Sequence, residues 1–143
     1  MKRVALFSTA LVLALLIFSC KTNSGSDREN IMSTEHEFAI MAEEAGVAEA
    51  FYHFAADSAV ILRGGHIIRG REAIRDYYLM NLKPGTRLLW TPDFADVSGD
   101  LGYTYGKYTH QVPDSAGNIT ESHGYFHTVW KRQPDGSWRF VWD

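Results

Sequence analysis

Residues 119–142, ITESHGYFHTVWKRQPDGSWRFVW, decide the fold class of this chain. β-branched and aromatic residues dominate both ends of the stretch, as is typical of strands. Between them, the segment 133–137 (QPDGS) predicts a tight turn, because proline presets φ and glycine tolerates a positive φ. The sequence therefore predicts two antiparallel strands, 119–131 and 138–142, with aromatic side chains at alternate positions of the second.

The residues before this hairpin first repeat the strand pattern and then change to a helical one. Two further strands are expected at 86–97 and 101–111, with Pro92 marking an irregularity or an edge. Upstream, apolar residues recur at helical spacing. The elements expected there are helices from Ser33 to Gly46, at 47–55 and at 71–81, and short strands at 59–62 and 66–69. Helices followed by a long antiparallel run indicate an α+β domain, in which a curved sheet and its helices leave a concave space for a small ligand.

The first twenty residues have the pattern of a bacterial secretion signal. Residues 1–3 are basic at two positions, and residues 4–18 are apolar apart from Ser8 and Thr9. Cys20 is the only cysteine of the chain. The apolar run is shorter than the roughly 20 residues that span a bilayer, so we interpret residues 1–19 as a signal peptide. Residues 17–20 (IFSC) resemble a lipobox, in which the cysteine is lipidated and becomes the new N-terminus. The alternative is an ordinary secretory peptide with an incidental cysteine.

Lipidation would hold the protein at the bacterial cell envelope, with Cys20 as its attachment to the membrane. Lys21, directly after the cysteine, favours sorting to the outer membrane, on its periplasmic or its surface side. Residues 20–32 are polar and lack apolar periodicity, so we expect a disordered, lipidated tether. Thr34 and Glu37 have the spacing of a capping box, and the folded domain is predicted to span 33–143.

Composition argues against several classes of function. The formal charge is −3, and removing the basic Lys2 and Arg3 with the signal lowers it to −5. A nucleic-acid-binding domain normally carries a basic patch, so no nucleic-acid partner is expected. The six histidines are scattered and form neither an HExxH motif nor a His-x-His pair, so no metal site is expected. No cofactor is expected either, because Gly64-Gly65 fits a hairpin turn and lacks the spacing of a phosphate-binding loop.

Several motifs resemble a known superfamily. Residues 51–60 (FYHFAADSAV) and 70–74 (GREAI) resemble the SnoaL-like and ketosteroid-isomerase-like superfamily, which has the nuclear transport factor 2 fold. Residues 98–106 (SGDLGYTYG) and 128–138 (TVWKRQPDGSW) are similar to an uncharacterised branch found in bacterial secreted and lipid-anchored proteins. The resemblance covers about 35–143 and implies a cone-shaped α+β fold, with N-terminal helices on the concave face of a curved antiparallel sheet. It implies little about function, because this fold hosts enzymes and binding modules alike.

The steroid-isomerase mechanism is not expected in this chain. Those enzymes use a carboxylate base after the first strand and a tyrosine on the first helix. By the resemblance, the base position falls at Arg63 and the tyrosine position near Ala39, so both groups are missing. An arginine cannot act as a base near neutral pH. At the mouth of a pocket, it would instead suit a carboxylate or phosphate of a ligand.

Alternation along two strands predicts which side chains face the cavity. The family pattern favours one face of the third long strand, and glycines open space beside the second strand. The predicted ligand-binding residues are Arg63, Trp90, Thr104, Tyr108, Phe126, Thr128 and Trp130. They indicate an aromatic-lined pocket for an anionic or carbonyl-bearing small molecule, although aromatics also suit an ordinary core. Asp143 is expected to pair with a cation such as Arg139 or Lys131 on a strand face.

Two alternatives to a binding module stay open. The first is an isomerase, lyase or hydrolase of the same fold, in which His127, Asp93 or Tyr108 acts as acid or base. The second is a structural module that forms a homodimer, either through the outer face of its sheet or through exposed Trp138 and Trp142.

Overall fold

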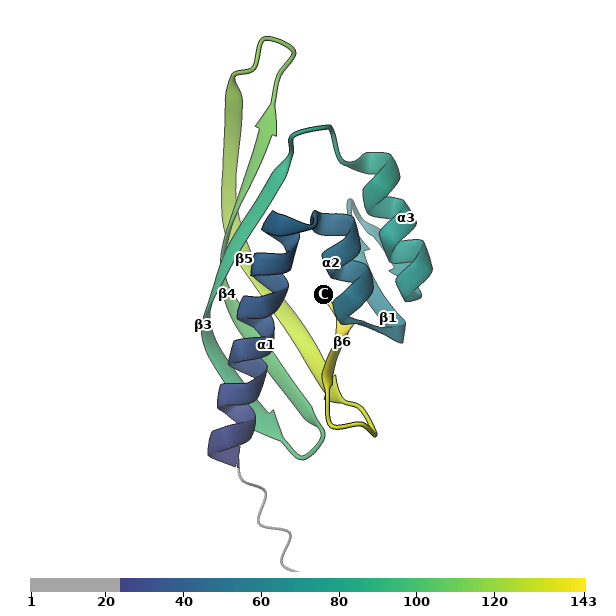
Figure 1. Ribbon diagram of the computed structural model, residues 1–143, viewed down its shortest axis with the longest axis vertical. Coiled ribbons are helices and arrows are strands. Elements are labelled where there is room, and N and C mark those ends of the chain that lie inside the picture. Colours follow the sequence, from purple (N-terminus) through teal and green to yellow (C-terminus); the bar gives the residue numbers. More distant parts are fainter. Residues whose placement is uncertain (1–23) are drawn as a thin grey trace, which may run out of the picture.

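The computed structural model describes residues 24–143, which form three helices and a six-stranded sheet (Figure 1). The helices are α1 (Ser24–Glu44), α2 (Val47–Phe54) and α3 (Arg71–Asn81). The strands are β1 (Ala55–Arg63), β2 (His66–Arg69), β3 (Arg87–Ser98), β4 (Leu101–Pro113), β5 (Ile119–Arg132) and β6 (Trp138–Trp142). The predicted signal peptide at 1–19 and the lipidation site Cys20 lie outside the described residues. Within residues 24–143, no helix combines the length and the apolar character of a membrane span.

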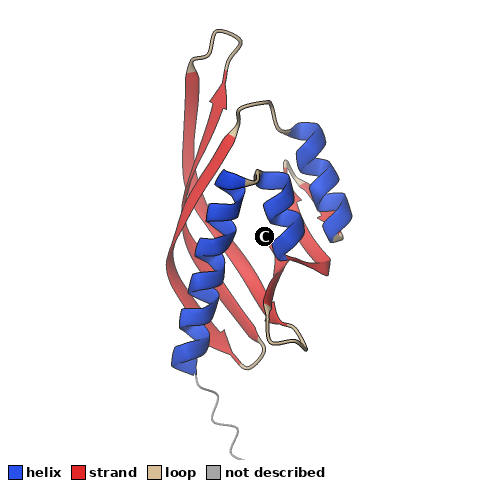
Figure 2. Ribbon diagram, in the orientation of Figure 1, coloured by secondary structure: helices blue, strands red, loops and turns tan. Residues whose placement is uncertain are grey.

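The strands form one curved sheet in the order β2-β1-β6-β5-β4-β3. Neighbouring strands are antiparallel, except that β1 and β6 pair in parallel. The helices cover one face of the sheet, and β4 and β5 extend beyond them as a long hairpin (Figure 2). The predicted α+β class, with helices on the concave face, is confirmed. The parallel pair was not predicted, because β1 and β6 are distant in sequence and no hairpin sets their relative direction.

The first helix begins earlier than the sequence predicts. Because α1 starts at Ser24, the disordered tether expected at 20–32 is wrong for its described part. The capping box expected at Thr34 and Glu37 is also wrong, since both residues lie inside the helix. The Thr34 hydroxyl donates to the main-chain oxygen of Asn30 (2.9 Å), a contact between successive helical turns.

Tertiary contacts explain why this polar segment is helical. Ile31 is fully buried against Gly102 of β4, where an added Cβ would lie 2.9 Å from the Ile31 Cδ1 atom. The ion pairs that join the segment to the strands are Asp27–Arg132 (2.5 Å) and Arg28–Asp96 (2.7 Å). Packing against the sheet therefore stabilises a helix that the local sequence signals only weakly.

The predicted strands agree closely with the observed ones, and two irregularities have physical causes. β1 begins at Ala55, earlier than predicted, because its first residues pair with β6. The irregularity expected at Pro92 is a shift of register between Pro92 and Phe94 on the edge strand β3. Gly106 of β4 faces this bulge, and an added Cβ there would collide with the Thr91 carbonyl oxygen. Glycine is therefore required at this position.

The core lies between the helices and the concave face of the sheet, and aromatic rings dominate it. The Phe38 ring centroid lies 4.7 Å from that of Phe51, 4.8 Å from that of Trp90 and 5.7 Å from that of Phe140. Trp130 of β5 is fully buried beside them. Such ring pairs contribute about 0.5–1.5 kcal/mol each beyond the burial of their area. The core thus supplies the stability of a domain whose described part contains no disulfide.

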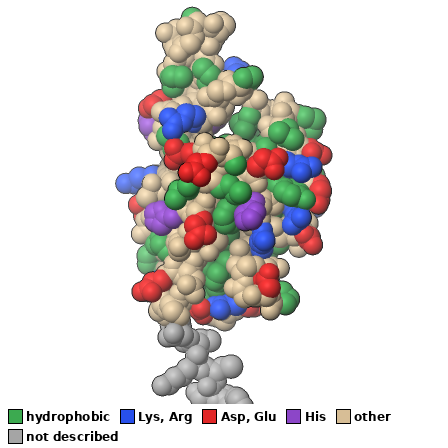
Figure 3. Space-filling view, in the orientation of Figure 1, with side chains coloured by type: hydrophobic (Ala, Val, Ile, Leu, Met, Phe, Trp, Pro, Cys, Tyr) green, Lys and Arg blue, Asp and Glu red, His purple; other side chains and the backbone are tan. Residues whose placement is uncertain are grey.

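Charged side chains of both signs are mixed over the surface. Acidic and basic residues lie interspersed on the face shown in Figure 3. Some of them join elements, as Arg87 of β3 does with Glu43 of α1 (2.9 Å). Exposed ion pairs contribute only about 0–1 kcal/mol each, so the stability of the domain depends mainly on its core.

Candidate functional site

A cavity of about 610 Å³ lies between α3 and the part of β5 that continues beyond the end of β6. This volume is in the range of small-molecule sites, about 300–1,000 Å³. The wall is largely aromatic, with a few polar groups. The lining residues are Phe51, Leu62, Arg63, Tyr77, Tyr78, Asn81, Leu82, Leu88, Trp90, Tyr108, His110, Tyr125, Phe126, His127, Trp142 and Asp143.

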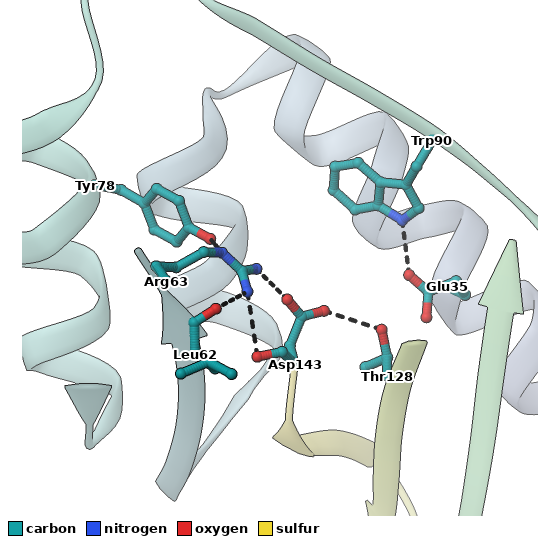
Figure 4. A network of polar contacts seen from close by, with 7 residues as sticks. All are labelled: Glu35, Leu62, Arg63, Tyr78, Trp90, Thr128 and Asp143. Atoms are coloured by element: carbon teal, nitrogen blue, oxygen red, sulfur yellow. Dashed lines mark hydrogen bonds and ion pairs between the residues drawn. The ribbon is translucent and has the colours of Figure 1, made fainter. Parts of the chain in front are cut away.

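One polar cluster faces this cavity and is centred on Arg63, at the end of β1 (Figure 4). Arg63 Nε donates to the Tyr78 hydroxyl oxygen (2.9 Å). Arg63 Nη1 donates to the main-chain oxygens of Leu62 (2.9 Å) and Asp143 (3.2 Å). Arg63 Nη2 forms an ion pair with Asp143 Oδ1, and Asp143 Oδ2 accepts from the Thr128 hydroxyl (3.0 Å). Both charges are therefore compensated within the protein.

The environment keeps Arg63 charged and Tyr78 neutral. Burial alone lowers the pKa of Arg63, but the Asp143 carboxylate and the Tyr78 hydroxyl more than offset it, so the pKa is raised overall. Burial also raises the pKa of Tyr78, against the opposing effect of Arg63. The Tyr78 oxygen accepts from Arg63, which leaves the O–H hydrogen of this neutral phenol to donate.

A second polar cluster lies deeper in the core, around Glu35 of α1. The Glu35 side chain is fully buried. Its Oε1 accepts from Trp90 Nε1 (2.7 Å), and its Oε2 accepts from the Thr104 hydroxyl (2.5 Å) and from Trp130 Nε1 (3.1 Å). Trp130 Nε1 also donates to the Thr104 oxygen (2.9 Å). Among the described residues, no lysine or arginine forms an ion pair with this carboxylate.

Burial moves the pKa of Glu35 towards neutral pH. Burial raises its pKa to about 7, and the nearby Asp143 carboxylate adds to the rise. The hydrogen bonds from Thr104, Trp90 and Trp130 oppose it, because they stabilise the charged form. Trp90 connects the Glu35 cluster with the cavity, since its ring lines the cavity while its nitrogen donates to Glu35.

The structure separates the predicted ligand-binding residues into two groups. Those that line the cavity are Arg63, Trp90, Tyr108 and Phe126. Those that are fully buried behind its wall are Thr104, Thr128 and Trp130. The second group lies on the predicted concave face, but its polar atoms bind the Glu35 and Asp143 carboxylates. These three residues therefore do not face a ligand directly but position the Glu35 and Asp143 carboxylates.

Sequence reasoning missed Glu35 altogether. Ile31, Glu35, Phe38 and Ala42 recur at i, i+4, i+7 and i+11, the spacing of one helical face. The three apolar members of this row are buried in the core. A glutamate in an otherwise apolar row is the signal that identifies a buried carboxylate, and it becomes visible only when the helix is extended back to Ile31.

The predicted partner of Asp143 was wrong. Arg139 and Lys131 were expected to pair with it, but the ion pair is formed by Arg63. The cause is the parallel pairing of β1 and β6, which places the end of β6 beside the end of β1. The Leu62 amide donates to the main-chain oxygen of Asp143 (3.0 Å), which fixes this arrangement.

The three predicted acid–base candidates do not form one set. Tyr108 and His127 line the cavity. Asp93 is exposed at the bulge of β3, outside the cavity wall, and β4 separates β3 from β5. The His127 ring, however, lies 5.7 Å from the ring of Tyr103, on the face of β5 opposite to Phe126 and Thr128. Its side chain is therefore on the outer face of the sheet. In the described part of the chain, no cluster of His, Cys, Asp or Glu side chains has the arrangement of a metal site.

The dimer contact through Trp138 and Trp142 was expected only if both rings were exposed, and Trp138 does not meet this condition. Trp138 is buried, and the Arg132 guanidinium lies over its ring, 4.7 Å from the centroid. Trp142 is partly exposed but lines the cavity. An association through both indole rings would need Trp138 to leave the core.

Comparison with solved structures identifies the fold. A nuclear transport factor 2 superfamily protein from Salmonella enterica serovar Typhimurium matches with a TM-score of 0.69 at 13% identity, over 82% of this chain and 88% of that chain. A nuclear transport factor 2-like protein from Novosphingobium aromaticivorans matches with a TM-score of 0.65 at 22% identity, over 82% and 79%. The association domain of C. elegans CaMKII matches with a TM-score of 0.62 at 17% identity, over 83% and 94%. No family model and no curated protein matches the sequence. The nuclear transport factor 2-like fold expected from the motifs is confirmed.

Proposed function

We propose that this nuclear transport factor 2-like domain binds a small molecule and is held at the bacterial cell envelope by a lipid on Cys20. The observation that carries the binding proposal is the cavity of about 610 Å³, whose aromatic wall surrounds Arg63, Tyr78 and Asp143. An aromatic wall buries the body of a ligand, and a few convergent polar groups orient it.

The polar cluster favours a neutral ligand with a carbonyl or hydroxyl group over a free anion. A ligand carboxylate would have to displace Asp143 from Arg63 and leave one carboxylate without its cation, which is unfavourable in a buried site. A carbonyl oxygen can instead accept the hydrogen of the Tyr78 hydroxyl without breaking the ion pair. We therefore expect a ring-bearing ketone, ester or alcohol.

A panel of matched compounds tests this proposal. Acetophenones, benzyl alcohols and benzoates are compared by ligand-observed NMR, and the ketones and alcohols should bind more tightly than the benzoates. Asn81→Trp, which places a bulky ring at the cavity wall, should abolish binding. Lys83→Trp, at an exposed position two residues further on, is the matched control and should leave binding unchanged. Tighter binding of the benzoates, or binding insensitive to Asn81→Trp, would contradict the proposal.

The anchoring proposal rests on the lipobox-like residues and gains a geometric consequence from α1. Three residues separate Cys20 from Ser24, where the helix begins. The membrane would then lie close to the start of α1 and to the β3–β4 turn, which the Arg28–Asp96 pair holds beside it. Cys20→Ala should abolish acyl labelling and release the protein from the membrane fraction. Unchanged retention would contradict the anchor.

We also propose that two copies of the chain associate through the outer face of the sheet. Phe94, Tyr103 and Tyr105 are exposed there, and the Phe94 and Tyr105 rings stack with centroids 5.4 Å apart. Exposed apolar patches mark interaction sites. Sedimentation should show a dimer that Tyr105→Glu dissociates and that Lys83→Glu, a control in the loop after α3, does not. A monomer at all concentrations would overturn this association.

A catalytic role has one specific support, because Tyr108 lines the cavity. An isomerase, lyase or hydrolase of this fold would use Tyr108 as its acid or base, since Asp93 lies outside the cavity wall and the His127 ring lies beside Tyr103 on the outer face of the sheet. Turnover that follows a pH–rate profile and disappears in Tyr108→Phe would favour the enzyme. No turnover across a broad panel of carbonyl compounds and lactones would favour the binding module.

A further inference from the structure

We infer that Glu35 is a proton-binding site linked to the cavity through Trp90 and Asp143, so that proton occupancy and ligand occupancy influence each other. The first half of this inference, the proton site and its link to Asp143, concerns the protein alone. The second half, the effect on a ligand, rests on the proposed binding function.

The surroundings of Glu35 stabilise a carboxylate without fixing its charge. The side chains that contact it are neutral donors, namely Trp90 from β3, Thr104 from β4 and Trp130 from β5. From α2, the same core receives the apolar rings of Phe51 and Phe54. A buried carboxylate with neutral donors and no cation is balanced between its two protonation states.

The charged groups around α1 either lie at the ends of the helix or carry the same negative charge as Glu35. The ion pairs between α1 and the strands are exposed or partly exposed, and they are Asp27–Arg132, Arg28–Asp96 and Glu43–Arg87. At the end of β6, Asp143 raises the pKa of Glu35 by its negative charge. Arg63 forms its ion pair with Asp143 and not with Glu35. Glu35 therefore senses the charge state of the Asp143–Arg63 pair.

A proton on Glu35 requires a rearrangement of hydrogen bonds. The indole N–H groups of Trp90 and Trp130 can only donate, whereas the Thr104 hydroxyl can donate or accept. With Glu35 ionised, all three donate to the carboxylate. A protonated Glu35 must donate its own O–H, and the Thr104 oxygen at 2.5 Å is the acceptor in reach. Proton uptake thus reverses the Glu35–Thr104 bond and turns the Thr104 hydrogen away.

Two routes connect this rearrangement with the cavity. Thr104 lies opposite Thr128 in the β4–β5 register, and Thr128 donates to Asp143 on the cavity wall. The reversed Thr104 hydroxyl can direct its hydrogen towards Thr128. Trp90 provides the second route, because its ring lines the cavity while its Nε1 depends on Glu35 as acceptor.

The coupling is reciprocal by thermodynamic linkage. A ligand that donates a hydrogen bond to Asp143 weakens the repulsion on Glu35 and promotes loss of its proton. A ligand that brings negative charge to Arg63 does the opposite. The affinity of the cavity for its ligand would therefore change across neutral pH, in opposite directions for these two kinds of ligand.

The test is an NMR titration of the ligand-free protein from about pH 5 to about pH 9, a range that covers the titration of a carboxyl group whose pKa is close to neutral pH. The ¹³C signal of the Glu35 carboxyl and the indole N–H signals of Trp90 and Trp130 should share one midpoint near 7. Glu35→Gln should remove the transition from both indoles. Glu37→Gln, an exposed carboxylate two residues further on, is the control and should preserve it. A Glu35 midpoint at the ordinary carboxyl value would overturn the proton site.

The link to the cavity has its own variant. Asp143→Asn removes the like charge and should lower the Glu35 midpoint by about half a unit or more; an unchanged midpoint would overturn the link. If Glu35→Gln does not fold, Trp90→Phe decides, since losing a bond to the carboxylate should raise the midpoint. Because no ligand is used, failure of the binding proposal leaves this result intact, and failure here leaves ligand binding intact.

Discussion

The two clusters of this domain treat a buried carboxylate in opposite ways. At the cavity wall, Asp143 accepts from Thr128 and pairs with Arg63, a cation held by Tyr78 on its other side. In the core, Glu35 receives three hydrogen bonds from neutral groups and no ion pair from the described residues. The comparison teaches that burial alone does not set the charge of a carboxylate. A cation partner stabilises the ionised form, whereas neutral donors leave the protonation state sensitive to pH.

The largest expected effect comes from removing the cation at the cavity wall. Arg63→Met leaves the Asp143 side chain, which is 10% exposed, without a counter-charge. Breaking one partner of a buried ion pair reduces the free energy of unfolding by about 3–5 kcal/mol, and urea unfolding measures it. Arg63→Met combined with Asp143→Leu should recover most of this loss. A single variant that loses less than about 1 kcal/mol would mean that Asp143 behaves as a surface carboxylate.

The second prediction concerns the pH dependence that Glu35 imposes on stability. Its pKa is 4.5 as an ordinary carboxyl and about 7 in the folded protein. Between these values the native state binds a proton that the unfolded state has lost, so this contribution to stability falls as pH rises and levels off above 7. The total loss is about 3 kcal/mol. Urea unfolding at several pH values should show this slope in the unmodified protein and not in Glu35→Gln.

Glu37→Gln is the control for that measurement, because its carboxylate is exposed on the same helix. It should retain the full slope between pH 4.5 and 7. A slope that survives Glu35→Gln would assign the pH dependence to other groups and would make the two clusters alike.

Most of the fold could be predicted, because its signals are local. Alternation and turn residues located β3 to β6, and helical spacing located α3 at its observed bounds. The start of α1 could not be found in this way. The polar residues before Ser33 are helical because Ile31 packs on Gly102, and no local pattern contains that contact.

The same distinction between local and long-range signals applies to the candidate site. Strand alternation grouped Thr128 with Trp130 on one face, and the family pattern and the glycines of the neighbouring strand assigned that face and Thr104 to the concave side. All three residues are buried there. The ion pair of Arg63 with Asp143 depends on the parallel β1–β6 pairing, which joins residues far apart in sequence. Local reasoning therefore named Asp143 but gave it the wrong cation partner, and it missed Glu35.

Trp90→Phe gives a smaller effect that separates the two clusters. It keeps an aromatic ring at the cavity wall but removes the N–H that donates to Glu35. Above pH 7, losing a bond to a charged acceptor should reduce the free energy of unfolding by about 1.5–3 kcal/mol, and below it by only about 1 kcal/mol. Equal losses at both pH values would show that Glu35 stays in one protonation state.

The smallest effect is expected for an exposed carboxylate on α1, the helix that also carries Glu35. Glu43 of α1 pairs with Arg87 at 2.9 Å, and both side chains are about half exposed. Arg87→Ala should lower the free energy of unfolding by about 0.5 kcal/mol, and added salt should abolish the difference because water and ions screen the pair. The loss in Arg63→Met should instead persist in salt, since Asp143 is shielded from solvent. Two ion pairs of the same chemistry would then differ by burial alone, whereas Glu35 differs from both by its lack of a cation.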